Sequence, residues 1–190
     1  MDTVRTQRRD AAATRNAILV AAKRLFTTKG FEGVGVREIA ADAGVTAALV
    51  NRYFGSKVGL FEEAVIPALN IDELMAGDRS TFGARAAVYF TTKSHDNNDL
   101  DPTVAFVRSA GSATVIPLVS EAIEKTVVER LAQWLGGADP KQRAALIISH
   151  LAGFDMMRRI VNVDALTSEH LEAITPRFAQ VIQGYVDDCL

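Results

Sequence analysis

Residues 46–57, TAALVNRYFGSK, gather hydrogen-bonding side chains in a short segment. They comprise the hydroxyl of Thr46, the amide of Asn51, the guanidinium of Arg52, the phenol of Tyr53 and the ammonium of Lys57. Groups of these kinds donate to phosphate oxygens, and amides and guanidinium groups also pair with the exposed edges of bases. The chemistry that this segment supports is therefore hydrogen bonding to a nucleic acid.

Apolar spacing predicts the helices that lead up to this segment. A first helix is expected over residues 11–29, with its apolar side chains on one face, and Gly30 supplies its end. A shorter helix is expected over residues 36–43. Gly44 ends it, because glycine readily adopts the left-handed backbone that a tight turn requires.

The next two helices begin at good capping residues. Thr46 is a suitable N-cap for a helix over 47–54, and Ser56 caps one that begins directly after it. Ala40 and Ala48 are small enough to let the helices on either side of the turn cross steeply, as in a helix-turn-helix. There the second helix enters the major groove while basic and hydroxyl groups hold phosphates. The same spacing also fits a three-helix cap with a solvated polar face.

The net charge of −2 hides an asymmetry along the chain. Residues 1–60 hold ten Lys and Arg against five Asp and Glu, a balance of +5. By subtraction from the totals of 21 and 23, residues 61–190 carry 11 − 18 = −7. A basic N-terminal segment on an acidic body is consistent with one end of the chain meeting a polyanion.

Composition bounds the remaining possibilities. A length of 190 residues with 48% hydrophobic content allows a substantial core. The single cysteine, Cys189, excludes a disulfide framework or a multi-cysteine metal site and fits a reducing, cytoplasmic setting. The longest charge-free apolar run contains a proline and is shorter than the roughly 20 residues of a membrane-spanning helix. We therefore expect a soluble protein with no membrane partner.

An enzyme would need a nucleophile with a base, or a set of metal ligands. The three histidines, His95, His150 and His170, have no partners at metal-ligand spacing. His150 is expected to be a core or interface residue, and no glycine-rich phosphate loop is present. We therefore predict no catalytic residues, no metal and no cofactor.

The segment GFEGVGVREIAADAGVTAALVNRYFGSKVGLF, within residues 14–65, resembles the N-terminal DNA-binding domain of the TetR family of bacterial transcriptional regulators. The resemblance implies an all-α chain with two domains. Residues 1–60 would form a three-helix helix-turn-helix domain. Residues 61–190 would form a larger helical domain that binds an effector and dimerises. The partners implied are a double-stranded DNA operator, a small molecule and a second copy of the chain.

The resemblance also implies roles for individual residues in DNA binding. It places Thr46, Ala47 and Ala48 at the start of the recognition helix, Asn51, Arg52 and Tyr53 on its groove and backbone faces, and Lys57 and Arg37 at phosphates. Most family members carry tyrosine where this chain has Asn51, and usually threonine where it has Gly35. Because asparagine can pair with adenine N6 and N7, Asn51 is a candidate for reading a base.

The effector-binding residues are predicted from two aromatic and basic segments. The candidates are Phe82, Arg85 and Tyr89 within residues 79–93, and Phe106 and Arg108 within residues 102–112. Aromatic rings mixed with arginine suit a pocket for an aromatic or anionic ligand. The same pattern also fits a plain core with surface arginines. The polar run at 94–101 between the two segments is expected to be a solvated loop.

The last two helices are candidates for the dimer interface. The predicted interface residues are Ile148 and Ala152 in a helix over residues 140–161, and Phe178, Val181 and Tyr185 in the C-terminal helix. The second group lies on one helical seam, and Thr175–Pro176 is expected to restart that helix. Together the two helices resemble the four-helix dimer interface of the family, which predicts a palindromic operator.

The predicted function is that of a ligand-responsive transcriptional regulator, a repressor that a small molecule releases from its operator. Pro67 is expected either to kink the fourth helix, which would couple the two domains, or to end it. The alternative function is a DNA-binding protein that has no effector or that a protein partner controls.

Overall fold

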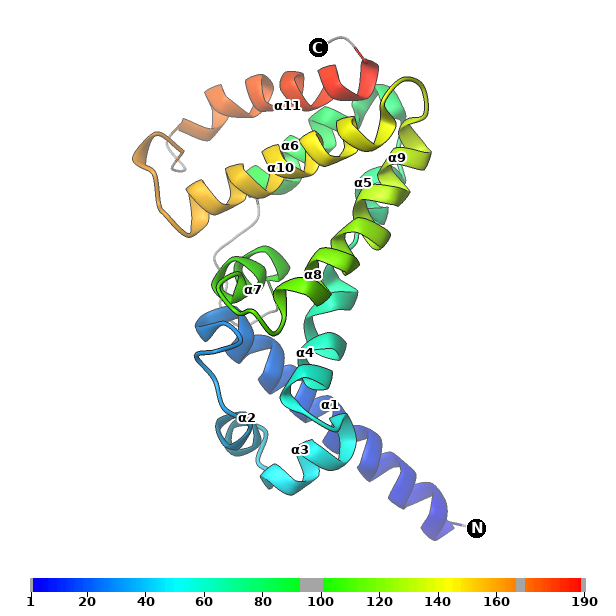
Figure 1. Cartoon of the computed structure of the whole chain (residues 1–190), viewed down its shortest axis with the longest axis vertical. Helices are drawn as coiled ribbons and strands as arrows, with labels where there is room; N and C mark the ends of the chain where they lie inside the picture. Colours follow the sequence, from blue (N-terminus) through cyan, green and yellow to red (C-terminus); the bar gives the residue numbers. More distant parts are fainter. Residues whose placement is uncertain (1, 93–100, 167–169, 189–190) are drawn as a thin grey trace. The chain divides into compact units, whose positions relative to one another are not determined.

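The computed structural model describes residues 2–92, 101–166 and 170–188, and every regular element within these ranges is helical (Figure 1). The α-helices are α1 (Asp2–Lys29), α2 (Val36–Asp42), α3 (Ala47–Phe54), α4 (Lys57–Val65), α5 (Asp72–Met75), α6 (Phe82–Thr92), α7 (Pro102–Ser109), α8 (Ile116–Ile123), α9 (Glu129–Leu135), α10 (Pro140–Arg159) and α11 (Leu171–Asp187). The prediction of an all-α fold is confirmed. The predicted loop at 94–101 lies outside the described residues, except for Asp101.

The chain packs as two compact units that are discontinuous in sequence. Unit 1 comprises Met1–Ala68 and Asp96–Ser120, and unit 2 comprises Leu69–His95 and Glu121–Leu190. The predicted boundary at residue 60 separates a DNA-binding domain from a regulatory domain, and this functional division stays a prediction. Packing follows a different division, because α4 and α7 belong with the N-terminal helices.

Three phenylalanine rings form the centre of unit 1. Phe26 of α1 and Phe61 of α4 are fully buried, with ring centroids 5.1 Å apart in an edge-to-face arrangement. The ring of Phe31, after α1, lies 5.5 Å from that of Phe61. α4 ends at Val65 and a 3₁₀ turn, Ile66–Ala68, follows. Of the two alternatives for Pro67 in that turn, the structure therefore has the helix end.

Helix α7 is hydrogen-bonded to the end of α1. Asp101 is its N-cap, and its carboxylate oxygen Oδ1 accepts from the backbone N–H of Val104 at 3.1 Å. The backbone N–H of Asp101 in turn donates to the hydroxyl of Thr27 at 3.2 Å. The backbone N–H of Phe31 donates to the hydroxyl of Ser109 at 3.0 Å. Unit 1 therefore includes a segment that lies far along the chain from its first four helices.

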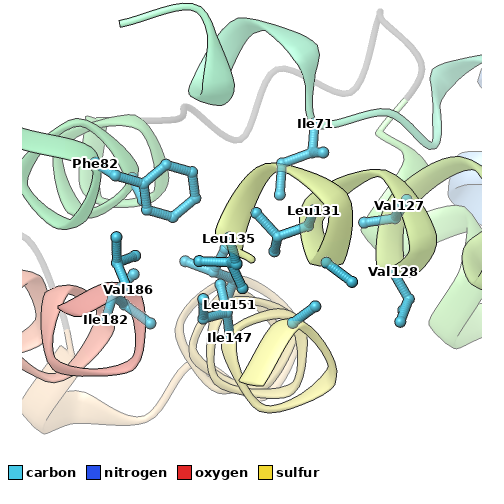
Figure 2. Packing of buried hydrophobic residues seen from close by; sticks show 13 residues of the cluster. Ile71, Phe82, Val127, Val128, Leu131, Leu135, Ile147, Leu151, Ile182 and Val186 are labelled. Carbon is cyan, nitrogen blue, oxygen red and sulfur yellow. The ribbon is translucent and has the colours of Figure 1, made fainter. Parts of the chain in front are cut away.

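Unit 2 is held together by a cluster of 13 buried apolar residues (Figure 2). The largest of its fully buried side chains are Phe82 on α6, Leu131 and Leu135 on α9, Ile147 on α10 and Ile182 on α11. α6 and α11 approach closely at Gly83, where a Cβ atom would collide with the carbonyl oxygen of Ala179. The backbone N–H of Gly83 also donates to the side-chain oxygen of Gln183 at 2.8 Å.

Two arginines bind the carbonyl groups at helix ends in unit 2. The guanidinium of Arg143 is buried and donates to the carbonyl oxygens of Ala138 at 2.9 Å and Tyr185 at 3.1 Å. Arg79 donates to the carbonyl oxygen of Val186 at 3.0 Å. Positive charge at the C-terminus of a helix stabilises it, because the unpaired carbonyls there carry partial negative charge.

Two sequence-based helix boundaries are wrong. α1 begins at Asp2 rather than near residue 11. α11 does not restart at Thr175–Pro176, because Pro176 lies inside one helix that begins at Leu171. Pro176 removes only one backbone donor near the start of that helix, and the hydroxyl of Thr175 donates to the carbonyl oxygen of Leu171 at 2.6 Å.

Candidate nucleic-acid interface

The turn between α2 and α3 is closed by backbone hydrogen bonds. The N–H of Val45 donates to the carbonyl oxygen of Ala40 at 2.9 Å, and Gly44 between them has φ +66°. That backbone conformation favours glycine, as the sequence predicted. Thr46 is the N-cap of α3 with an extended backbone, but its side chain makes no capping hydrogen bond. The predicted helix-turn-helix is confirmed in its boundaries.

The inner face of the motif is apolar. Ile39 and Ala40 of α2 are buried, as are Val50 and Phe54 of α3. The expectation that Ala48 lies at the helix crossing is wrong, because Ala48 is exposed. With 3.6 residues per turn, the buried pair at positions 50 and 54 turns position 48 to the opposite side of α3.

The outer face of α3 consists of Ala48, Asn51 and Arg52, all of which are exposed. Their spacing of three and four residues places them side by side on the helix. Neither the amide of Asn51 nor the guanidinium of Arg52 has a hydrogen-bond or ion-pair partner within the described ranges. Two polar side chains on this face are therefore available to a ligand.

The other predicted DNA-binding residues of this motif flank that face. Thr46 is exposed at the N-terminal end of α3, and Arg37 is exposed in the first turn of α2. Ala47 and Tyr53 are half-buried, and the ring of Tyr53 lies 6.4 Å from that of Phe54. The DNA-binding roles of all these residues stay predictions.

Several basic side chains near the motif are paired within the protein. The ion pairs are Arg15 with Glu63, Arg24 with Asp42, and Lys29 with Glu38. Arg37 and Arg52, in contrast, have no acidic partner in the part of the chain that the structure describes. The cations that remain for phosphate contacts therefore include one from each helix of the motif.

Lys57 has a structural role that the sequence did not indicate. Its ammonium donates to the carbonyl oxygens of Phe31 at 2.7 Å and Val34 at 3.0 Å, and it lies 4.0 Å from the centre of the Phe31 ring. These contacts tie the start of α4 to the segment between α1 and α2. Two of the three ammonium hydrogens are therefore used within the protein. The predicted phosphate contact, which stays a prediction, would depend on the third.

Three of the candidate effector-binding residues lie in unit 2. Phe82 is fully buried with its ring 5.1 Å from that of Trp134, and Tyr89 is 43% exposed. The guanidinium of Arg85 donates to the carbonyl oxygens of Leu74 at 2.7 Å and Asp78 at 2.6 Å. Arg85 therefore braces the chain between α5 and α6.

The other two candidates, Phe106 and Arg108, lie on α7 in unit 1. Phe106 is half-buried and Arg108 is exposed. The carbonyl oxygen of Arg108 faces Gly30 so closely that a Cβ atom at Gly30 would collide with it. The effector-binding role of all five candidates stays a prediction.

The candidate dimer residues lie on α10 and α11 of unit 2. Ile148 and Ala152 are half-buried. Phe178 stacks on Phe154 with ring centroids 4.3 Å apart, and Val181 is 39% exposed. Their place at a dimer interface stays a prediction.

His150 lies beside the last of the candidate dimer residues. Its ring centroid is 5.2 Å from that of Tyr185, and its Nδ1 atom is 2.8 Å from the carbonyl oxygen of Leu146 in the preceding turn. Leu146 itself is 44% exposed, so an apolar surface continues along α10. Among the described residues, no helix is long and apolar enough to cross a membrane.

Comparison with known proteins gives two family matches. Residues 80–186 match the family described as "Tetracyclin repressor-like, C-terminal domain", and residues 18–64 match "Bacterial regulatory proteins, tetR family". The chain is also similar to "Probable HTH-type transcriptional regulator YttP" of Bacillus subtilis (strain 168), with 45% identity over 53 residues. That match spans 28% of this chain and 26% of the relative, about a quarter of its length.

Two solved structures resemble the whole chain. A TetR-family regulator from Streptomyces coelicolor A3 is 26% identical, with a TM-score of 0.59 over 93% of this chain and 96% of that one. NalD, the secondary repressor of the MexAB-OprM multidrug efflux pump in Pseudomonas aeruginosa, is 20% identical, with a TM-score of 0.61 over 89% of this chain and 94% of that one. The second likeness concerns the fold alone.

Proposed function

Because the chain belongs to the TetR family of bacterial transcriptional regulators, we propose that it is a repressor that a small molecule releases from a palindromic operator. DNA binding and regulation of transcription follow from the family. The repressing role, the effector and the operator are the parts that we propose.

The outer face of α3 carries this proposal. It follows a closed turn at Gly44 and presents the side chains of Asn51 and Arg52, which have no partner in the described part of the chain. Arg37 adds a second exposed cation at the start of α2. A helix of this kind fits the major groove, with the arginines at backbone phosphates on either side.

The dimer is supported by the surface of α10 and α11. Leu146 and Val181 are large apolar residues that are partly exposed there. Gly153 of α10 has no atom within 4 Å of the position that a Cβ would take, so the helix surface is open at that point. Two copies related by a two-fold axis would present their recognition helices about 34–36 Å apart, which matches one turn of DNA.

Control by a small molecule is supported by the family match of residues 80–186 to the repressor-like C-terminal domain. The description of that family as repressor-like supports repression as the outcome. The alternative is a regulator with no small-molecule effector. It is supported by the cluster of buried apolar residues that α6, α9, α10 and α11 contribute (Figure 2).

Binding of the full-length protein to DNA from its own upstream region tests the proposal. The measurement is made at two salt concentrations, with and without a set of small apolar and anionic compounds. We expect specific binding that weakens with salt and that at least one compound releases. Arg52→Ala should weaken binding to all sequences and lower the salt slope by about one, because one phosphate contact is lost.

Arg130→Ala is the matched control, since Arg130 pairs with Asp72 in unit 2 and lies outside the helix-turn-helix. It should leave both the affinity and the salt slope unchanged. Absence of specific binding would contradict the proposal. Specific binding that no compound alters would contradict the effector and favour the alternative.

A further inference from the structure

The outer face of α3 carries three different chemistries at neighbouring positions. Ala48 offers a methyl group, Asn51 an amide and Arg52 a guanidinium. All three are exposed, and the two polar groups have no partner among the described residues. This face therefore combines a charged group suited to phosphates with an amide that can pair with a base edge and a methyl group that makes no hydrogen bonds.

We propose that Asn51 reads an adenine and that Ala48 contacts the methyl group of a thymine in the neighbouring base pair. Each operator half-site would then hold two adjacent A·T pairs beneath α3. This inference rests on the proposed function, because it assumes that α3 lies in the major groove.

The amide of Asn51 has one hydrogen-bond donor and one acceptor that match those on the major-groove edge of adenine. Adenine presents an acceptor at N7 and a donor at N6 in the major groove, and an asparagine side chain offers one donor and one acceptor at the same spacing. A guanine presents two acceptors there, so it cannot satisfy the amide oxygen. No hydrogen bond within the described protein competes for the Asn51 amide.

Ala48 is suited to thymine because it is apolar, exposed and short. The C5 methyl of thymine is the apolar feature of the major groove, and an alanine methyl makes a favourable contact with it. A short side chain also lets the backbone of α3 approach the base edges. Ala48 is exposed, so its methyl group is not part of the buried core.

The spacing of the two residues fits neighbouring base pairs. Asn51 follows Ala48 by three positions, which is about 4.5 Å along the helix axis. Successive base pairs lie about 3.4 Å apart. Arg52 lies on the other side of Ala48 from Asn51 on the helix surface, so it can hold a phosphate while the two neutral groups face the bases.

The test begins with operators selected by the full-length protein from a randomised pool of DNA duplexes. The selected half-sites should share two adjacent A·T pairs. One adenine is then replaced by 7-deazaadenine, which lacks the N7 acceptor, and the adjacent thymine by deoxyuridine, which lacks the methyl group. Affinities are measured for the native protein, Asn51→Ala and Ala48→Gly.

The native protein should lose roughly tenfold in affinity with 7-deazaadenine, within the range for one base contact. It should lose about fourfold with deoxyuridine, which corresponds to one buried methyl group. Asn51→Ala should not respond to 7-deazaadenine, and Ala48→Gly should not respond to deoxyuridine. Comparing modified and unmodified DNA within each variant removes any effect of the substitution on the helix itself.

Two outcomes would overturn the inference. One is selected half-sites without adjacent A·T pairs. The other is a penalty from 7-deazaadenine that is the same for Asn51→Ala as for the native protein. In both cases specific DNA binding would stand. If the pool yields no specific sequence, the proposed function itself fails.

Discussion

Replacing Lys57 by methionine is expected to destabilise the protein by about 3–4 kcal/mol in the free energy of unfolding. The ammonium makes two hydrogen bonds, to the carbonyl oxygens of Phe31 and Val34. Hydrogen bonds from a charged donor contribute about 1.5–3 kcal/mol each. Because Lys57 is only partly buried, we take the lower part of that range. The contact with the Phe31 ring adds about 0.5–1 kcal/mol.

Methionine retains the apolar part of the lysine side chain, so the substitution isolates the ammonium. Urea denaturation of the full-length protein at fixed protein concentration measures the change. Lys23→Met is the matched control, because it removes the same charge from α1 at a residue with no hydrogen-bond or ion-pair partner among the described residues. It should change the free energy of unfolding by less than about 0.5 kcal/mol.

DNA binding separates the two roles that Lys57 could have. If the ammonium acts only at a phosphate, Lys57→Met would leave the unfolding curve unchanged and lower the salt slope of DNA binding by about one. That result would refute the structural role. If it acts only within the protein, the unfolding curve shifts while the salt slope, measured well below the denaturation temperature, stays the same.

Five further changes have expected outcomes. Arg143→Met should cost about 3 kcal/mol or more in unfolding free energy, because the buried carbonyl of Val186 and several part-buried carbonyls lose their donor. Gly83→Val should lower the free energy of unfolding by at least about 1–3 kcal/mol, because the added side chain forces α6 away from α11. Gly153→Ala should not destabilise the protein, because no described atom outside its own helix lies near the added Cβ. Thermal denaturation measures both changes. Val181→Glu should shift the protein toward monomers in analytical ultracentrifugation. A chain cut after Ala68 should lack cooperative unfolding, because α7 is missing from unit 1.

Local signals predicted the helix-turn-helix well. The predicted starts of α3 and α4 agree with the structure, with Thr46 and Ser56 at the N-cap positions, although only Ser56 makes a side-chain capping hydrogen bond. The hydroxyl of Ser56 accepts from the backbone N–H of Gly59 at 3.0 Å, as a capping residue should. Gly44 is likewise a local signal, since only its own backbone has to adopt the turn conformation.

Contacts between distant segments were not predictable in the same way. The partners of Lys57 lie on the other side of α2 and α3 in the sequence, so no pattern around Lys57 indicates them. The helix-breaking effect of Pro176 was overestimated, because a proline in the second turn removes a single backbone hydrogen bond and α11 continues through it. The sequence placed Ala48 at the crossing of α2 and α3, whereas it lies on the exposed face of α3. A small residue suits both a helix crossing and a surface that a ligand approaches, so size alone could not decide between them.

The segment between α1 and α2 explains how part of unit 1 encoded far along the chain can act on the DNA-reading helices. Ser109 of α7 accepts from the backbone of Phe31, the hydroxyl of Ser112 donates to the carboxylate of Glu32, and Lys57 holds the same segment from α4. This segment leads directly to Gly35, the N-cap of α2. We therefore expect that a displacement of α7 would shift the start of α2 more directly than it would shift α3.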